Sequence, residues 1–276
     1  MTRVTRLVAL GLLAVGLGAC QPAPVRPAAA SGPGRIDRIL ASGELRAGLS
    51  ASQPPFNMKN KSGEIVGLDV DIVRALAQAM GVKLRLVEKP FADLLPALEK
   101  GDDVDLVISG LTITPERNAK VAFAGPYFIS GKAVLSRSQA ISDAADVAAL
   151  NVPGRTYVAL AGSTSEAFVR ENLPRAKVVP APDYDAGVRM VIDGKADGMV
   201  ADLLICMLSV WRNPNAALST SKVPLTAEPL GIALPADDPL FVNLVQNYLT
   251  TLEYTGLLAQ FKTRWLAEGA WVSELP

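Results

Sequence analysis

The sequence predicts an α/β protein built as two lobes with a cleft between them. Short apolar segments typical of buried strands alternate with segments whose apolar residues recur at helical spacing. This alternation runs twice along the chain, with a break near residues 129–132. The 276 residues, half of them apolar, are enough for one large core or two smaller ones.

The first run of elements follows residues 21–34, a stretch rich in proline and alanine that we interpret as a flexible tether. The expected order is strand 45–49, helix 69–80, strand 82–87, helix 92–100 and a strand that begins at Val104. Gly81 and Gly101 follow the two helices, where glycine commonly ends a helix. This order favours a parallel sheet covered by helices.

A second run with the same rhythm begins near Gly131 with GKAVLSRS. The expected order is strand 156–160, helix 165–173, strand 177–180, helix 184–193, strand 196–200, a helix through Trp211, strand 230–234, and helices near 239–254 and 257–266. We expect the chain to cross between lobes at 129–132 and 223–226. Residues 36–130 and 226–276 then form lobe 1, and residues 131–225 form lobe 2.

The composition excludes several classes of function. Lysine plus arginine equals aspartate plus glutamate, at 27 each, so no net charge favours nucleic acid. Histidine is absent, which excludes Ser-His-Asp catalysis, histidine-based metal sites and imidazole acid–base chemistry. We expect neither a metal nor a cofactor.

The N-terminal residues are typical of an export signal. A short basic start precedes an apolar run over 7–17 that is too short to span a membrane. The following LGAC resembles a bacterial lipobox, which implies a lipoprotein signal peptide at 1–19, a lipidated Cys20 and a flexible linker over 20–35. Acylation would hold the protein outside the cytoplasm at a bacterial membrane, in the periplasm or at the cell surface. The alternative is an ordinary secretory leader with a chance cysteine.

The second cysteine, Cys206, stands in the apolar run LLICML and has no evident disulfide partner. We expect it to be a small core residue.

The stretch VDLVISGLTITPER, residues 104–117, is the most informative part of the chain. It is typical of a buried strand followed by a helix that begins at Thr114-Pro115, an N-cap and a first-turn proline. A strand followed by a helix start does not require the side chains of Ser109, Thr112 and Arg117. Hydroxyls, free backbone N–H groups and a fork-shaped cation together predict a pocket for a small carboxylate.

Four segments resemble the bacterial family 3 solute-binding proteins: ELRAGLSASQPPF, GEIVGLDVDIVRALAQAMGVKLRLV, FADLLPALEKGDDVDLVISGLTITPER and VAFAGPYFISG. These proteins are receptors that feed amino acids to ABC importers. The resemblance covers about residues 36–266. It implies a two-lobed periplasmic-binding-protein fold of type II, with a ligand cleft between lobes joined by two hinge strands. It also implies a monomer that delivers its ligand to ABC permease subunits.

The resemblance assigns the ligand's head group to both lobes. Arg117 would grip an α-carboxylate bidentately, and Thr112, with Ser109 and the Gly110 backbone, would complete that site. The alternatives are a solvated arginine paired with a nearby acid, and a turn hydroxyl. Asp202 would accept the α-ammonium group, or it could simply cap the helix that follows.

The segment GSTS at 162–165 lies between a strand and a helix of lobe 2. Free N–H groups there could meet the same carboxylate when the lobes close. We favour Ser163 and Thr164 as ligand contacts, although a plain helix cap explains Ser165 equally well.

The ligand's side chain is less well predicted. Phe91 is either an aromatic wall of the site or a core residue, and Phe56 is better explained as core. Ser50 and Gln53 stand where many relatives carry an acid and an aromatic residue. Without the acid, a buried cationic side chain would lack a partner, which favours a neutral polar or small amino acid, or a similar ligand.

Three functions compete. We expect a transport receptor whose closure is coupled to ligand affinity. Some proteins that resemble the family are cyclohexadienyl dehydratases, which remove water and carbon dioxide from prephenate or arogenate. That elimination needs a proton donor in the closed cleft, and we expect Glu166 and Glu228 on the helix and hinge surfaces, which argues against an enzyme. The third candidate is a ligand sensor that acts through a separate membrane partner.

Overall fold

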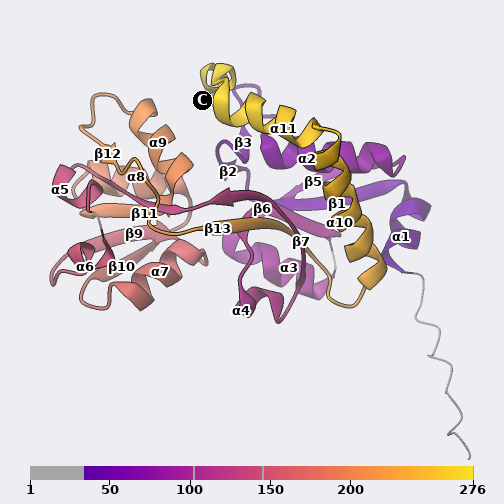
Figure 1. Ribbon diagram of the computed structural model, residues 1–276, viewed down its shortest axis with the longest axis horizontal. Coiled ribbons are helices and arrows are strands. Elements are labelled where there is room, and N and C mark those ends of the chain that lie inside the picture. The colour runs from indigo at the N-terminus through magenta and orange to yellow at the C-terminus, as the bar shows by residue number, and fades with distance from the viewer. Residues whose placement is uncertain (1–33, 102, 145, 276) are drawn as a thin grey trace, which may run out of the picture. The chain divides into compact units, whose positions relative to one another are not determined.

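The computed structural model describes residues 34–101, 103–144 and 146–275 (Figure 1). The expected leader over 1–19, Cys20 and nearly all of the linker therefore lie outside the described residues. The first described helix, α1 (Arg35–Ser42), begins at the last residue assigned to that linker.

The first sheet has five strands, in the order β5 (Lys83–Glu88), β1 (Glu44–Leu49), β6 (Leu106–Thr112), β13 (Glu228–Leu234) and β7 (Ala122–Ser130). Strand β1 runs parallel to β5 and β6, and β13 runs antiparallel to β6 and β7. Only part of the sheet is parallel, because β7 and β13 belong to the segments that leave for the other lobe and return from it.

Helices and short strands complete the first lobe. Its main helices are α2 (Leu68–Ala79), α3 (Leu94–Lys100), α10 (Pro239–Tyr254) and α11 (Leu257–Lys262). The short elements are β2 (Ser52–Gln53), β3 (Asn57–Lys59), β4 (Ile65–Val66), η1 (Phe91–Asp93), α4 (Pro115–Asn118), η2 (Thr263–Ala267) and η3 (Ala270–Glu274). Phe56 is 1% exposed in the apolar core of this lobe, as expected.

The second sheet also has five strands, in the order β10 (Lys177–Ala181), β9 (Thr156–Leu160), β11 (Gly198–Asp202), β8 (Lys132–Ser136) and β12 (Ser219–Thr220). Strand β9 runs parallel to β10 and β11, whereas β8 runs antiparallel to β11 and β12. The carboxyl ends of β9, β10 and β11 therefore share one edge, where open α/β sheets bind ligands.

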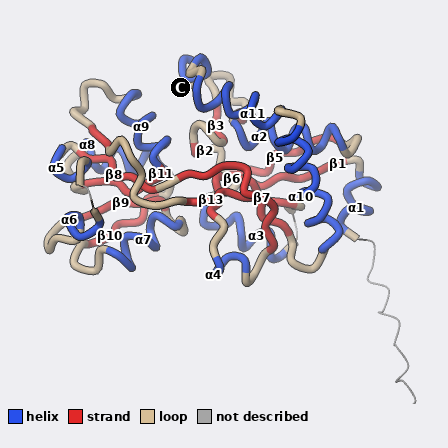
Figure 2. The backbone as a smooth tube through the Cα atoms, viewed as in Figure 1, coloured by secondary structure: helices blue, strands red, loops and turns tan. Residues whose placement is uncertain are grey.

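Five helices accompany the second sheet: α5 (Gln139–Ser142), α6 (Val147–Leu150), α7 (Thr164–Asn172), α8 (Tyr184–Ile192) and α9 (Leu203–Arg212). Figure 2 distinguishes these helices from the strands of the two sheets. Cys206 on α9 is buried and free, as expected, and burial raises the pKa of its thiol to about 12.

The chain passes between the two sheets at two places that lie against each other. Gly131 links β7 to β8, and the return segment joins β12 to β13. The Leu225 N–H donates to the Lys132 carbonyl at 2.7 Å, and the Lys132 N–H donates to the Thr226 hydroxyl at 3.1 Å. The expected two-lobed α/β fold is thus confirmed. No helix among the described residues is long and apolar enough to cross a membrane.

Candidate functional site

The junction between β6 and α4 positions Arg117. Thr114 caps α4 by accepting a hydrogen bond from the Arg117 N–H at 3.3 Å, and Pro115 is the first helical residue, as expected. The guanidinium donates to the Thr112 carbonyl at 2.9 Å. Because α4 has a single turn, this cap and this anchor fix where the arginine side chain can point.

The Arg117 side chain reaches the opposite lobe. Its guanidinium donates to the Gly162 carbonyl at 3.3 Å and lies 5.9 Å from the centroid of the Phe91 ring. Burial lowers the pKa of Arg117, while the nearby Glu228 carboxylate raises it. An arginine keeps its charge under such shifts, so the cleft contains a fixed cation.

Ser50, Gln53 and Ser109 are hydrogen-bonded to one another. The Gln53 amide donates to the hydroxyls of Ser50 and Ser109, each at 3.1 Å, and the two hydroxyls lie 3.2 Å apart. All three residues are buried. These polar groups therefore form a preorganised wall of lobe 1 rather than three independent contacts.

Sequence reasoning missed Asp69, which lies behind that wall. Its carboxylate accepts hydrogen bonds from Tyr127 at 2.7 Å, Asn57 at 2.8 Å and the Gly110 N–H at 3.0 Å. Burial raises the pKa of Asp69 to about 6, against the opposing effect of these three donors. The Gly110 N–H, expected to face a ligand, thus donates to an internal acid. An acid in the first turn of a helix is common, so the sequence carried no signal of this role.

In lobe 2, the hydroxyls at the start of α7 have two different roles. Ser163, not Ser165, is the N-cap: its oxygen accepts from the Glu166 N–H at 3.2 Å, and its hydroxyl donates to the Leu160 carbonyl at 2.7 Å. Thr164 instead faces lobe 1, with its hydroxyl 3.2 Å from that of Thr112.

Glu166 also belongs to this helix start. It accepts from the Gly162 N–H at 2.8 Å and forms an ion pair with Arg170 at 2.6 Å. The N–H groups of Gly162 and Glu166 are therefore both engaged within lobe 2.

A buried cluster of charges that the sequence did not reveal surrounds Lys132. The Lys132 ammonium donates to the Thr164 hydroxyl at 2.8 Å and pairs with Glu228 at 3.3 Å and with Asp202 at 3.7 Å. Asp202 stands at the N-cap position of α9, but its side chain makes no cap hydrogen bond there. Burial raises the pKa of Asp202, and Lys132 lowers it.

Glu228 corrects one expectation. It was expected on the hinge surface, but its side chain is only 12% exposed. It is the first residue of β13, where the returning segment meets β8, and it accepts from the Thr226 hydroxyl at 2.8 Å. The only sequence signal was an acid beside an expected lobe crossing.

Phe91 and Tyr184 lie close to the charged groups. Both are buried and belong to one apolar cluster whose members come from both lobes. Burial and the charge of Asp202 raise the pKa of Tyr184 well above its ordinary value. Phe91 therefore combines its two expected roles, because it is packed as core and also lies beneath Arg117.

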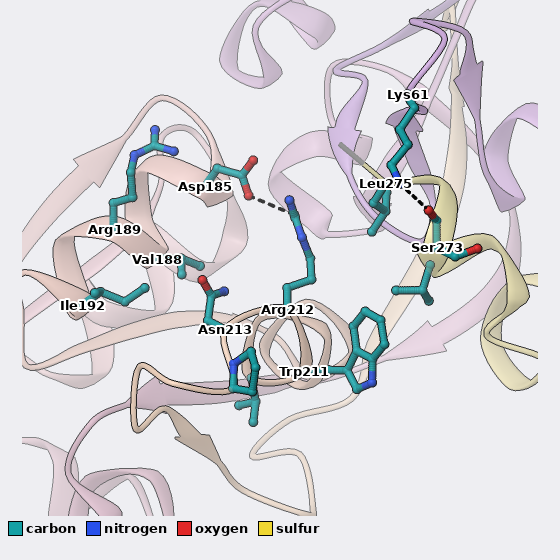
Figure 3. Close-up of a pocket in the computed structure, with 13 residues that line it drawn as sticks. Lys61, Asp185, Val188, Arg189, Ile192, Trp211, Arg212, Asn213, Ser273 and Leu275 are labelled. Carbon is teal, nitrogen blue, oxygen red and sulfur yellow. Dashed lines mark hydrogen bonds and ion pairs between the residues drawn. The ribbon is translucent and has the colours of Figure 1, made fainter.

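Two pockets are relevant to the choice of site. One of about 360 Å³ is lined by Arg117, Lys132, Thr164 and Glu228, among others. A larger one, of about 930 Å³, lies beside α8 and α9, with Trp211 and Arg212 across from Lys61 (Figure 3). Arg117, Ser163 and Thr164 line the smaller pocket, whereas none of the predicted head-group residues lines the larger one and Asp202 and Thr112 line neither. We therefore place the candidate site at the smaller pocket, where charged groups of both lobes converge.

This geometry suits a small zwitterion. The Arg117 cation of lobe 1 lies near the carboxylates of Glu228 and Asp202, which raise its pKa, and hydroxyls of both lobes meet at Thr112 and Thr164. In the part of the chain that the structure describes, no group of three or more histidine, cysteine or acidic residues could hold a metal ion.

Comparisons with known proteins agree with this architecture. The family model of the bacterial extracellular solute-binding proteins, family 3, matches residues 45–268. The cyclohexadienyl dehydratase of Pseudomonas aeruginosa is 29% identical over 84% of this chain and 86% of its own length. The ABC transporter arginine-binding protein 1 of Escherichia coli is 27% identical over 78% of this chain and 87% of its own.

Solved structures show the same likeness. The ancestral amino acid-binding protein AncCDT-1, a precursor of cyclohexadienyl dehydratase, is 34% identical and superimposes with a TM-score of 0.75. The match covers 84% of this chain and 99% of that one.

Proposed function

The chain belongs to the bacterial extracellular solute-binding proteins of family 3, and we propose that it is a receptor that binds one amino-acid-like ligand between its lobes. The receptor works outside the cytoplasm and delivers its ligand to the permease subunits of an ABC importer. Curated relatives whose names state amino-acid binding and ABC transport support this proposal.

One observation carries the proposal. Arg117 is anchored on lobe 1 by the Thr112 carbonyl and reaches the Gly162 carbonyl of lobe 2. A guanidinium has five N–H donors, so these two bonds leave others for a carboxylate. A ligand held there would touch both lobes at once, which couples binding to closure.

The individual contacts form the finer part of the proposal. The ligand's carboxylate binds Arg117 and Thr112, and its ammonium group binds Asp202. Thr164 completes the contact from lobe 2. The following residues form or support the walls: Ser50, Gln53, Phe91, Ser109, Gly110 and Ser163. The hydrogen-bonded wall of lobe 1 supports this arrangement, because fixed dipoles bind a charged ligand with little reorganisation.

The remaining expectations are also proposals. The division into 36–130 with 226–276 and 131–225 is supported by sheet membership. The LGAC segment supports cleavage after residue 19 and lipidation of Cys20, which fatty-acid labelling of the chain and of Cys20→Ala would test. A monomer is the simplest state for a receptor that closes around one ligand.

A thermal-shift screen against the standard amino acids tests the proposal. A ligand present at 100 times its dissociation constant should add about 2.7 kcal/mol to the free energy of unfolding. Arg117→Ala and Asp202→Ala should abolish most of that gain, because a hydrogen bond to a charged group contributes about 1.5–3 kcal/mol. Arg85→Ala and Asp185→Ala remove exposed charges outside the cleft. These two variants should be stabilised by the ligand as much as the unchanged chain is.

Two outcomes would contradict the proposal. If no amino acid stabilised the protein, a receptor for this ligand class would be excluded. If Arg117→Ala and Asp202→Ala bound the ligand as tightly as the unchanged chain, the function could stand, but the site would lie elsewhere.

The buried position of Glu228 favours a second candidate, a dehydratase. A dehydratase would need Glu228 in its protonated form, so that the carboxyl group beside Lys132 and Thr164 donates a proton to the leaving hydroxyl while the substrate's ring carboxylate is lost as carbon dioxide and the ring becomes aromatic. The similarity to the Pseudomonas aeruginosa enzyme supports testing it. Turnover of prephenate or arogenate that disappears in Glu228→Gln, without stabilisation by amino acids, would establish the enzyme instead of the receptor.

A further inference from the structure

Lys132 is an almost fully buried charged side chain beside the cleft. It is 1% exposed, and its ammonium group has three polar partners: Thr164, Glu228 and Asp202. A buried cation is tolerated only when it is paired. The buried position of Lys132 therefore depends on the two carboxylates, and their negative charges in turn depend on Lys132.

The charges around the cleft balance one another. Asp202 and Glu228 supply two carboxylates, and Lys132 supplies one ammonium group. Arg117 is on the same lobe as Glu228, whose carboxylate raises its pKa, and it supplies one guanidinium. A zwitterion whose carboxylate pairs with Arg117 and whose α-ammonium pairs with Asp202 therefore adds no net charge to the site.

Other acids near the cleft do not change this balance of charges. Asp69 is fully buried behind the wall, and its carboxylate is satisfied by three donors. Glu166 is paired with Arg170. Glu116 and Glu171 line the same pocket but are exposed, so solvent screens their charges.

We infer that Lys132 sets the charge class of the ligand, so that the site prefers an amino acid with an uncharged side chain over one with a cationic side chain. This inference rests on the proposed amino-acid receptor. A lysine or arginine side chain would add a positive charge to this balanced site and bring a further cation near the Lys132 ammonium. Among the described residues near the cleft, no other buried acid is free to accept it. Repulsion between two cations several ångströms apart in a partly buried site weakens binding on the order of tenfold or more.

A series of charge variants tests the inference by calorimetric titration with glutamine, arginine and glutamate. Lys132→Met removes one positive charge from the cluster and should improve binding of arginine relative to glutamine by about tenfold or more. Glu228→Gln removes one negative charge and should improve glutamate relative to glutamine. The double variant has the net charge of the unchanged chain and should restore its preference for glutamine.

The outcomes separate the two levels of the proposal. Relative affinities that stay within about twofold across the series would overturn the inference, because Lys132 would then be only structural. A preference of the unchanged chain for arginine would overturn it directly. If Lys132→Met does not fold, Glu228→Gln and the double variant decide. If the unchanged chain binds none of the three ligands, the inference is wrong. The proposed receptor function is wrong only if the thermal-shift screen also finds no amino acid that stabilises the protein.

Discussion

Asp69 and Lys132 are buried ionisable residues with separate sets of partners near the candidate site. Asp69 is held by three donors within lobe 1, whereas Lys132 is held by acids where the two lobes meet. A buried charge destabilises the protein unless its partners are correctly placed. The two residues therefore constrain the lobe 1 wall and the lobe crossing much more tightly than exposed charges could.

We expect Asp69 to make the stability of the protein depend on pH. Its pKa rises from 3.8 to about 6 on folding, so between these values the folded protein holds a proton that the unfolded chain has released. The stabilisation is complete below about pH 4 and is lost as the pH rises through about 6. One pKa unit corresponds to 1.36 kcal/mol, so the loss is at most about 3 kcal/mol.

Asp69→Asn isolates the contribution of the Asp69 charge to stability. The amide oxygen of the substituted asparagine can still accept hydrogen bonds from Asn57 and from the Gly110 N–H. Urea unfolding of both proteins at pH 4, 5, 6 and 7 measures the difference in their free energies of unfolding. The unchanged chain should lose stability relative to Asp69→Asn as the pH rises. A difference that is constant over this range would show that Asp69 is charged throughout it.

Residues whose roles depend on local sequence could be predicted, and those whose roles depend on contacts distant in the chain could not. Thr114 and Pro115 start a helix through their own backbone geometry, and Arg117 lies within the same stretch. In contrast, Lys132 heads an apolar strand and resembles a solvated strand end. Its burial depends on contacts with Thr164, Asp202 and Glu228, which all lie far later in the sequence.

At the level of elements, one close approach between the lobes joins η1 to the loop before α7. A Cβ added to Gly162 would lie 3.0 Å from the Ala92 Cβ and 3.1 Å from its Cα. Gly162 also has a φ of +72°, which disfavours other residues. The glycine thus serves both the local turn and the contact between lobes.

We expect Gly162→Ala to weaken ligand binding by about tenfold, because the added methyl group would keep the lobes apart. A loss of about 1.4 kcal/mol in the free energy of binding corresponds to a tenfold loss of affinity. Gly194→Ala is the matched control, since Gly194 has the same φ of +72° but nothing within 4 Å. Both variants should lose about 1–2 kcal/mol of stability from backbone strain. Calorimetric titration should separate them, and equal affinities would show that the lobes do not approach here in the bound state.

The strand β7 shows why some elements could not be predicted. Its sequence, AFAGPYFIS, contains Gly125-Pro126, which argues against a strand because proline lacks the N–H that a ladder requires. The structure accommodates it because β7 is an edge strand with one partner, β13. In contrast, α10 begins at Pro239 and ends at Tyr254, as predicted, because its proline start and long periodic pattern are local features.

For the molecule as a whole, α9 connects the ligand site to the contact between lobes. Asp202 precedes its first turn, and Leu204 and Leu208 pack against the apolar core of lobe 1. A helix is stiff over this length, so under the proposed function a ligand that binds Asp202 would also hold the apolar contact in place. Closure would then gain free energy from surface that never touches the ligand.

We expect Leu208→Ala to weaken ligand binding by about 3–10-fold without altering any ligand contact. The substitution removes apolar area that is buried only when the lobes meet, and a partly buried leucine contributes on the order of 1 kcal/mol. Met207→Ala is the control, because Met207 is on the same helix but is 51% exposed. Calorimetric titration of both variants, with urea unfolding in the absence of ligand, separates closure from folding. If the two variants bound the ligand equally well, the α9 contact would contribute nothing to closure, and affinity would arise from the cleft alone.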